Sequence, residues 1–343
     1  MSHLLRRELP LLLASSGLFL SAPAARAANE CEGTVFTADE GGASISAVDL
    51  SSGRISSAAV PIVPHNVQAV AGGRRLFAVG TSAGPHGADH ARAGGRLLVL
   101  EPVSGEAPRV MAEIAAGRHP GHVVADAAGE RAFITDSEAD ALLIVDVAQR
   151  RLAASVPVGG YPHGLRLSPD GREAWLANVR DGTVSVVDVA AAREVARIPV
   201  GSSPVQVGFV PDGSRVYVSL RGADAVAEID ARTRSVLRRI PVGRGPVQVF
   251  ATPDGRFLYV ANEGTRAAPG TTASVIDLAA GSVVATVETG RGAHGVVVCG
   301  NGTRAFVTNL YDDTLAEIDV ATRTVKRRLR VGRTPNGVTW APA

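Results

Sequence analysis

The sequence contains 343 residues, of which 35 are lysine or arginine and 33 are aspartate or glutamate, so its formal net charge is +2 at pH 7. A chain this close to neutrality lacks the concentrated basic surface that drives electrostatic binding to nucleic acids or anionic membranes. We therefore expect no nucleic-acid partner and no electrostatic attachment to a membrane.

Residues 1–27 are typical of an export signal. Arg6 and Arg7 form a short basic region, residues 9–20 are mostly apolar, and residues 25–27 have the small-x-small pattern of a cleavage site. The apolar stretch has about half of the roughly 20 residues that a membrane-spanning helix needs, and no later segment comes close. We expect cleavage after Ala27, no membrane span, and a single domain over 28–343 that is periplasmic or secreted. A retained amphipathic anchor is the alternative.

A repeat of about 42 residues, a length within the range of known repeat architectures, runs through the rest of the chain. One marker is a glycine that recurs at equal steps with a single longer one, at Gly117, Gly159, Gly201, Gly243, Gly290 and Gly332. A second marker is an aspartate with the same steps, at Asp146, Asp188, Asp230, Asp277 and Asp319. Two markers with one spacing indicate a repeat architecture rather than the two domains that the length alone would suggest.

Each repeat contains four short runs rich in β-branched residues, separated by turn signals. In one repeat the first turn is Pro-Asp-Gly at 169–171, and the four runs are residues 164–168, 173–178, 183–188 and 194–200. The absence of any apolar period of the helical kind excludes a helical solenoid. Four antiparallel strands in a unit of this length form one blade of a β-propeller.

The two ends of the chain complement each other. Only one strand, at residues 337–341, follows the last full repeat, whereas residues 34–39, 43–50 and 54–60 match second, third and fourth strands. Together they complete one blade, and the six internal repeats bring the number to seven. The sequence therefore predicts an all-β, seven-bladed propeller with one blade completed by both termini, closed without an unpaired sheet edge. We expect this propeller to be a monomer.

Two cysteines, Cys31 and Cys299, fall in or beside the turn after the first strand of two neighbouring blades. A disulfide between them would fix the N-terminal segment to its neighbour and close a very long loop, which contributes a few kcal/mol in the chain-entropy account. Two free thiols are the alternative. No CxxC motif for a metal or haem is present.

Several phrases of the repeat resemble the YVTN-family β-propellers, which are secreted or periplasmic proteins. These phrases are Val-Tyr-Val-Ser at 216–219, Leu-Tyr-Val-Ala-Asn-Glu-Gly-Thr at 258–265, Thr-Val-Ser-Val-Val-Asp at 183–188 and Arg-Gly-Ala-His-Gly-Val at 291–296. The resemblance covers the mature chain and implies the fold, but not a ligand. It extends more distantly to the haem d1 propeller of cytochrome cd1 nitrite reductases. A complete reductase is excluded because no CxxCH motif is present.

Most repeats have a proline near the start of the first strand, for example Pro64 and Pro162, and we call this position the proline slot. Histidines break the symmetry of the repeat directly after it. The residue after this slot in successive blades is His65, Gly121, His163, Val205, Val247, His294 and Asn336. A purely structural role would place the same residue type at each position, so we predict an asymmetric site at the mouth of the central channel. Imidazoles suit a transition metal or haem iron. The alternative is that each histidine binds loop backbone or channel water, since His65, His163 and His294 belong to non-adjacent blades.

Other polar residues are expected on the same face. A long loop over residues 81–95 carries His86 and His90, which we include with the three channel histidines as candidate metal ligands; a tolerated insertion is the alternative. The ends of second strands add candidates for ligand binding, namely Asn178, Arg180, Asn262, Glu263, Asn309 and Tyr311. Asparagines there could simply satisfy turn backbone groups. The recurrent aspartates, with Asp49, are expected to be structural.

Three functions fit this sequence. The first is an exported periplasmic binding or interaction protein that holds a small molecule or a protein partner at the histidine-bearing face. The second is a metal- or haem-binding accessory or redox-linked protein, and the third is a propeller lyase or lactonase using metal or histidine acid–base chemistry. No Gly-x-Ser-x-Gly motif and no nucleophile beside a base is evident, so the sequence does not assign an enzyme activity.

Overall fold

The computed structural model describes residues 31–83, 94–103 and 105–343. Within it, Cys31–Ala343 form one compact unit. The predicted export signal and two candidate ligands, His86 and His90, lie outside the described residues. Among the helices of the described part, none is long and apolar enough to cross a membrane.

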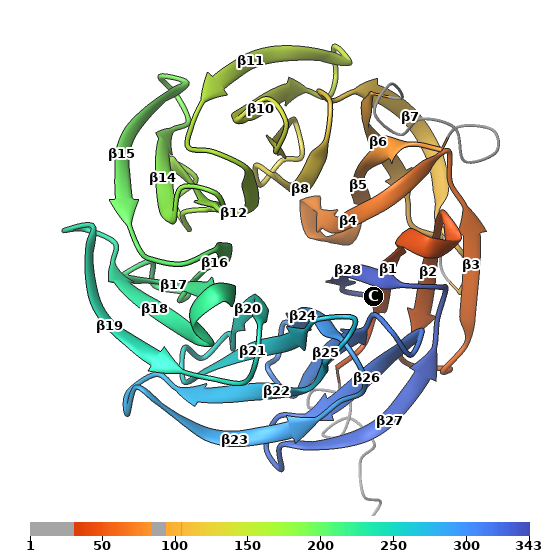
Figure 1. Ribbon diagram of the computed structural model, residues 1–343. Helices are drawn as coiled ribbons and strands as arrows, with labels where there is room; N and C mark the ends of the chain where they lie inside the picture. Colours follow the sequence, from red (N-terminus) through yellow and green to blue (C-terminus); the bar gives the residue numbers. More distant parts are fainter. Residues whose placement is uncertain (1–30, 84–93, 104) are drawn as a thin grey trace, which may run out of the picture. The chain divides into compact units, whose positions relative to one another are not determined.

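The described residues form seven four-stranded antiparallel sheets that radiate from a common centre, as Figure 1 shows. We number these sheets as blades 1 to 7. Blade 1 contains, from the centre outward, β28 (Pro335–Ala341), β1 (Thr34–Asp39), β2 (Ser44–Asp49) and β3 (Ile55–Ala59). The first and last strands of the described residues thus lie side by side in one sheet, which confirms the seven-bladed fold and the blade completed from both ends of the repeat region.

The other six blades follow in chain order, each with its first strand nearest the centre. Blades 2 and 3 contain β4 (Ile62–Val70), β5 (Arg75–Ser82), β6 (Gly95–Glu101), β7 (Arg109–Ala115), β8 (Pro120–Ala125), β9 (Arg131–Asp136), β10 (Ala141–Asp146) and β11 (Arg151–Pro157). Blades 4 and 5 contain β12 (Pro162–Leu167), β13 (Glu173–Asn178), β14 (Thr183–Asp188), β15 (Arg193–Pro199), β16 (Pro204–Phe209), β17 (Arg215–Leu220), β18 (Ala225–Asp230) and β19 (Ser235–Pro241). Blades 6 and 7 contain β20 (Pro246–Ala251), β21 (Phe257–Gly264), β22 (Pro269–Asp277), β23 (Ser282–Glu288), β24 (Ala293–Val298), β25 (Arg304–Asn309), β26 (Thr314–Asp319) and β27 (Thr324–Arg330). Short 3-10 turns occur at η1 (Glu40–Gly42), η2 (Ala71–Gly73) and η5 (Arg221–Ala223).

Neighbouring blades pack through apolar side chains on both sheet faces. Between blades 2 and 3, for example, Phe77 and Leu97 share one buried cluster with Val123 and Ile134, and all four are fully or almost fully buried. Each such side chain contributes about 1.5–3 kcal/mol on burial. This packing on two faces explains why the strands are apolar runs rather than alternating patterns.

The glycine marker of the repeat pairs with a buried polar residue at the end of the second strand. A Cβ atom at Gly159 would lie 2.4 Å from Asn178 Nδ2, and one at Gly243 would lie 2.4 Å from Asn262 Nδ2. The same close approach joins Gly117 to Asp136, Gly290 to Asn309 and Gly332 to Asp39. The glycine is therefore required by the close approach of this side chain.

The recurrent aspartates have the structural role predicted for them. Asp188 Oδ1 accepts a hydrogen bond of 2.8 Å from the Ala191 backbone N–H, and Asp230 accepts an equivalent bond from Thr233. Asp49, Asp146, Asp277 and Asp319 make the same contacts in their own blades. Each of these carboxylates holds the turn between the third and fourth strands of its blade.

The two cysteines meet, but they do not form the predicted disulfide. Cys31 and Cys299 are buried in one apolar cluster between blades 7 and 1, and both are free thiols. A hydrogen bond from Cys31 lowers the pKa of Cys299 to about 6, whereas this bond and burial raise the pKa of Cys31. Cys299 Sγ also lies 3.0 Å from Asn301 Oδ1. The two residues are neighbours as predicted, but their thiols are hydrogen-bonded and are not joined by a disulfide.

The inner strand of each blade is irregular where it carries the symmetry-breaking residues. In blade 4, Pro162 pairs with Asn178 and Leu165 with Leu176, so two inner-strand residues lie opposite one partner. The other six blades have the same kind of register shift in their innermost pair. A bulge redirects side chains out of the regular pleat. Here it places both residues after the proline slot next to the centre of the ring.

Candidate metal centre

Each blade contributes at least one polar side chain from the two positions after its proline slot. Where the first position is a glycine or valine, the second carries the polar group; where the first is polar, the second is glycine, or asparagine in blade 2. The resulting set, in blade order from 2 to 7 and then 1, is His65, His122, His163, Gln206, Gln248, His294 and Asn336. Four histidines therefore come from two adjacent positions of the repeat.

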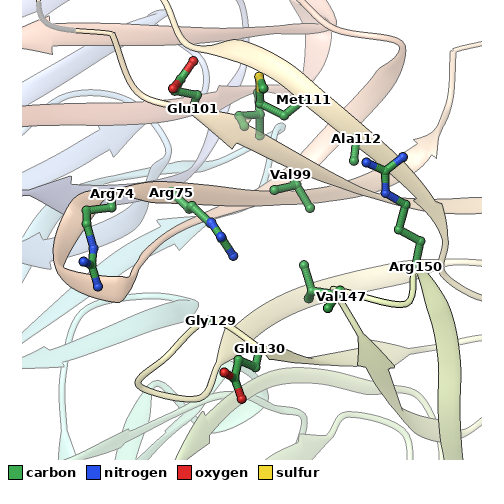
Figure 2. Close-up of a pocket in the computed structure, with 12 residues that line it drawn as sticks. Arg74, Arg75, Val99, Glu101, Met111, Ala112, Gly129, Glu130, Val147 and Arg150 are labelled. Atoms are coloured by element: carbon green, nitrogen blue, oxygen red, sulfur yellow. The ribbon is translucent and has the colours of Figure 1, made fainter.

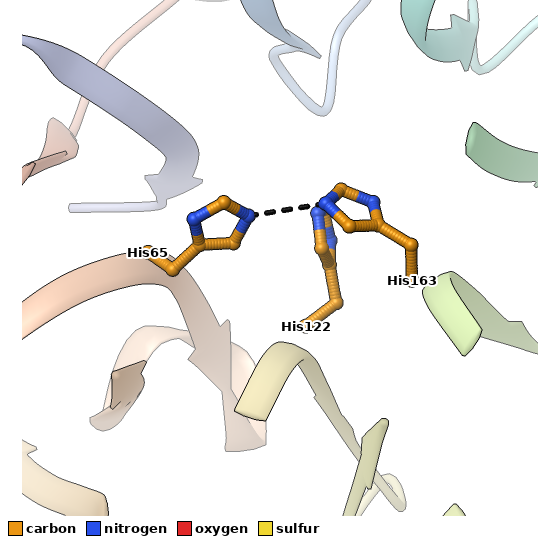
Figure 3. Close-up of side chains that lie close together, drawn as sticks. All are labelled: His65, His122 and His163. Atoms are coloured by element: carbon orange, nitrogen blue, oxygen red, sulfur yellow. Dashed lines mark hydrogen bonds between the residues drawn. The ribbon is translucent and has the colours of Figure 1, made fainter. Parts of the chain in front are cut away.

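Three of these histidines converge, and we call His65, His122 and His163 the histidine triad. They lie on the inner strands β4, β8 and β12 of three successive blades, and one ligand nitrogen from each falls within 4.8 Å of the other two. The Nε2 atoms of His65 and His163 are 3.2 Å apart, as Figure 3 shows. Ring centroids are separated by 4.8–5.8 Å.

The hydrogen bonds around the triad assign the imidazole protons. His163 Nδ1 donates to the carbonyl oxygen of Val205 at 3.3 Å, which leaves its Nε2 as an acceptor. Asn336 Nδ2 donates to His65 Nδ1 at 3.1 Å, so the proton of His65 is on Nε2 and is shared with His163. His122 Nδ1 lies 3.5 Å from the side-chain amide of Gln206. Its Nε2 is buried and has no hydrogen-bond partner among the described residues.

Burial keeps two members of the triad neutral. Burial, together with the neighbouring histidine side chains, lowers the pKa of His163 to about 3 and holds the pKa of His122 well below its ordinary value. At neutral pH both imidazoles are therefore neutral, and each keeps one nitrogen lone pair. This is the form in which histidine binds a metal.

Glu40, in η1 of blade 1, lies next to the Nδ1 atom of His65, on the side of the ring that faces away from His163. Its Oε2 atom accepts a hydrogen bond of 2.7 Å from Asn336 Nδ2 and lies 3.6 Å from His65 Nδ1. Burial opposes ionisation of Glu40, but its contacts with His65 and Asn336 outweigh burial and lower its pKa to about 2. An ionised carboxylate behind the outer nitrogen of a histidine fixes the ring in the orientation that metal ligands adopt.

A second cluster lies at the same end of the propeller, in blades 5 to 7. Glu263 is at its centre: Tyr311 donates a hydrogen bond of 3.1 Å to it, Arg221 donates one of 3.2 Å, and His294 Nε2 is 3.7 Å from its Oε2. Both Glu263 and His294 are buried, and burial lowers the pKa of His294. The outer nitrogen of His294, Nδ1, has no partner among the described residues. We call these four residues the Glu263 cluster.

With this geometry established, the chain can be compared with known proteins. The sequence profile of YNCE-like β-propellers matches residues 104–304, more than half of the chain. The chain belongs to the YNCE-like β-propeller family. This match confirms the resemblance to repeat propellers that the sequence phrases carry. No curated protein matches the chain.

Solved structures similar to this YNCE-like propeller share its fold at low sequence identity. The periplasmic gluconolactonase of Pseudomonas aeruginosa is 19% identical with a TM-score of 0.72, covering 90% of this chain and 99% of that one. A functionally unknown protein from Desulfotomaculum acetoxidans is 14% identical with a TM-score of 0.74, over 90% and 99% of the two chains. Hydrazine synthase of Kuenenia stuttgartiensis is 17% identical with a TM-score of 0.68, over 81% and 89%.

The structure brings together some of the residues predicted from the sequence and separates others. His65, His163 and Asn336 contact one another at the triad, while Glu263, Tyr311 and His294 form the Glu263 cluster. Arg180 lies apart and forms an ion pair of 3.2 Å with Asp140. The asparagines predicted to line the mouth are instead fully buried inside their blades, where they pack on the marker glycines: Asn178, Asn262 and Asn309.

The sequence reasoning missed His122, Gln206 and Gln248. It compared only the first residue after the proline slot, and these three occupy the second. His122 lies in the blade between those of His65 and His163, so the triad comes from three adjacent blades. These residues could have been found by comparing both positions after the proline slot, because a small residue at the first position is accompanied by a polar one at the second.

Grooves on the opposite face offer no comparable chemistry. One of about 520 Å³ lies between blades 2 and 3 and is lined by residues such as Arg75, Met111 and Glu130 (Figure 2). Grooves of about 510 and 480 Å³ recur between blades 4 and 5 and between blades 5 and 6. A groove that recurs from blade to blade follows from how the repeats stack, so it does not mark a unique site.

The triad fits a single metal ion better than a haem. Three imidazole nitrogens within 4.8 Å of one another can face one ion from one side, which leaves its other coordination positions open. A haem iron instead takes protein ligands along one axis, on opposite faces of the porphyrin. Three converging histidines do not match that arrangement.

Proposed function

We propose that this YNCE-like propeller is an exported protein that binds one divalent transition-metal ion through His65, His122 and His163 and offers its open positions to a small ligand. The observation that carries the proposal is the convergence of three imidazoles from three successive blades. Histidine nitrogen suits zinc, copper and nickel, and a set of three protein ligands is typical of zinc sites that keep a position for water or substrate.

The energetics of the triad support the same function. A buried polar atom without a partner, such as His122 Nε2, costs about 1–3 kcal/mol. His65 and His163 also point their Nε2 atoms at each other at 3.2 Å rather than at separate partners. Coordination of one ion would satisfy all three nitrogens at once, which no described side chain does.

For metal to bind at the Nε2 atoms, two imidazole protons would have to move: that of His65 and that of His122, whose Nδ1 faces the donating amide group of Gln206. His163 already holds its proton on Nδ1, where Val205 accepts it, so its Nε2 is ready to coordinate. The proton of His65 is on Nε2 and must pass to Nδ1, next to the Glu40 carboxylate at 3.6 Å. Asn336, which now donates to both groups, would keep its bond to Glu40 and release His65.

Metal titration of protein purified without a histidine tag tests this function. After removal of metal by a chelator, calorimetry with Zn²⁺ or Co²⁺ should give one ion per chain for the wild type. His122→Ala should abolish this binding, whereas His119→Ala should not, because the exposed His119 lies outside the triad and bonds Ser137. Absence of stoichiometric binding, or equal binding by the His122 variant, would overturn the proposal.

We also propose that the chain works in the periplasm or outside the cell. The support is the export-type pattern of residues 1–27 in the sequence. Mass spectrometry of the protein from the periplasmic or culture fraction should give a mature chain that starts at Ala28. Recovery of the intact chain from the cytosol alone would contradict this location.

A lactonase-type hydrolase is the second candidate function. It is favoured by the Glu263 cluster, where a neutral His294 beside a carboxylate could remove a proton from the water that attacks a lactone carbonyl. The new C–O bond would form first, the ring C–O bond would then break, and the leaving alkoxide would take up the proton that His294 removed from the water. A pH-stat assay on gluconolactone with the wild type and His294→Ala tests it, and equal rates for the two would reject it.

A further inference from the structure

Arg166 is the one charged residue at its position in the repeat. It lies on the inner strand β12 of blade 4, just beyond His163 of the triad. The equivalent residues of the other blades, in order from blade 1 to blade 7 without blade 4, are Thr339, Gln68, Val124, Gly208, Phe250 and Val297. A residue that breaks the repeat only once is not needed for the blade itself, so Arg166 calls for a separate explanation.

The guanidinium of Arg166 has no anionic partner in the described part of the chain. Its one hydrogen bond is from NH1 to the carbonyl oxygen of its neighbour Leu165, at 2.9 Å, and no described carboxylate forms an ion pair with it. Burial alone lowers its pKa to about 10, so it stays charged at neutral pH. Arg166 is half-buried, and a charge partly removed from water is normally paired, because leaving it unpaired is costly.

Arg166 and His163 of the triad lie three residues apart on the same inner strand, β12. Two carboxylates at this end of the propeller are already engaged, since Glu40 accepts a hydrogen bond from Asn336 and faces His65, while Glu263 accepts hydrogen bonds from Arg221 and Tyr311. Neither of them is left to balance Arg166.

A divalent ion on the triad would increase this imbalance. Three neutral histidines contribute no negative charge, so the ion would add two positive charges beside an unpaired guanidinium. An anion on the open coordination positions would offset part of this charge and could contact both cations. A planar guanidinium matches a carboxylate with two parallel hydrogen bonds, and a carboxylate oxygen is also an ordinary ligand of zinc-type ions.

We propose that the open positions of the metal bind a small carboxylate whose second contact is the guanidinium of Arg166. This inference rests on the proposed metal centre and names the class of ligand that it accepts. Arg166 would select for negative charge and for a carboxylate-shaped group, whereas the histidine triad would hold the ion. Metal binding and anion binding therefore depend on different residues and can be tested separately.

The test uses the visible spectrum of the full chain loaded with Co²⁺. The cobalt band itself, recorded before any anion is added, reports the metal centre; its absence would refute the proposed function. Acetate is then titrated at constant ionic strength, with perchlorate as the balancing salt. We expect a saturable change of the band in the wild type, and acetate affinity at least 10-fold weaker in Arg166→Gln with the cobalt band retained.

Two further variants test whether the guanidinium of Arg166 itself is needed, and one further anion tests whether the ligand is a carboxylate. Arg166→Lys keeps the charge without the planar fork and should give an intermediate affinity, while Arg180→Gln at the outer rim should behave as the wild type. A normal cobalt band with no response to acetate, or an equal response in Arg166→Gln, would overturn the inference. An Arg166-dependent response to phosphate but not to acetate would overturn the carboxylate class.

Discussion

Each imidazole of the histidine triad has one nitrogen engaged by a neighbouring group and one that faces the other histidines. The engaged partners are Asn336 for His65, Gln206 for His122 and the Val205 carbonyl for His163. These partners come from blades 1 and 5, whereas the histidines come from blades 2 to 4. Residues from five blades therefore build this one site. The orientation of each ring is therefore set by residues that would not themselves touch the ion.

Glu40 should control metal affinity through His65. Its carboxylate lies 3.6 Å from His65 Nδ1, where it would accept a hydrogen bond from the Nδ1–H that metal binding at Nε2 requires. We predict that Glu40→Gln weakens zinc affinity about 10- to 100-fold, which is the usual effect of losing such a partner. Calorimetry measures it, with Glu138→Gln, an exposed carboxylate in blade 3, as the control. Unchanged affinity in Glu40→Gln would contradict the role of this residue.

The ionised Asp39 carboxylate should lower the free energy of unfolding at neutral pH. It is fully buried, and burial raises its pKa to about 6 despite hydrogen bonds from Thr37, Ser44 and Ser46. The unfolded value is about 4, so the folded state resists ionisation of this group. The cost is absent below about pH 4, develops between pH 4 and 6, and is complete above that range.

In blades 4 and 6 an uncharged residue takes the place of Asp39. Asn178 and Asn262 occupy this position and donate hydrogen bonds to the equivalent hydroxyl groups. We predict that Asp39→Asn stabilises the protein by about 1–3 kcal/mol at pH 8 and by nearly nothing at pH 4. Urea unfolding at the two pH values measures the difference. A variant that is less stable than the wild type at pH 8 would show this account to be wrong.

At the scale of the element, each blade is specified by local rules that the sequence displays. The turn aspartates, the proline slot and the marker glycine fix four strands per repeat, and all four appear in every blade. The bulge in the inner strand is not visible in the sequence, because it depends on how two strands are paired. This is why His122, one residue further along than the compared position, was missed while His65 and His163 were found.

The marker glycine should be intolerant of a larger side chain. A Cβ atom at Gly243 would lie 2.4 Å from Asn262 Nδ2, and Asn262 is held by two hydroxyl partners. We predict that Gly243→Ala costs about 1–3 kcal/mol, as overpacking usually does. In an Asn262→Ala background the same change should cost clearly less, and a double-mutant cycle by thermal unfolding measures this coupling. Equal costs in both backgrounds would exclude the clash as the cause.

At the scale of the whole molecule, closure of the ring joins the two termini and completes the site. The C-terminal strand β28 pairs with β1, and it also carries Asn336, which contacts His65 and Glu40. The number of blades and this closure were predictable, because they follow from counting strands at the two ends. The ligand is not predictable in this way, because it depends on side-chain positions across several blades.

Removal of the closing strand should open the ring. A chain truncated after Thr334 loses β28 and leaves the edge of β1 unpaired, which exposes apolar surface and invites aggregation. We predict loss of the cooperative thermal transition and of metal binding, whereas removal of Pro342 and Ala343 alone should leave both intact. Circular dichroism and size-exclusion chromatography measure the outcome. A truncated chain that melts like the wild type would refute closure as a main source of stability.

Anomalous diffraction tests the central claim most directly. Crystals of the untagged protein loaded with Zn²⁺, measured above and below the zinc absorption edge, would place the ion without reference to activity. We predict one strong anomalous peak at the centre of the histidine triad, about 2.0–2.1 Å from one nitrogen each of His65, His122 and His163. A triad without a peak, or with a peak bound by other residues, would contradict the account.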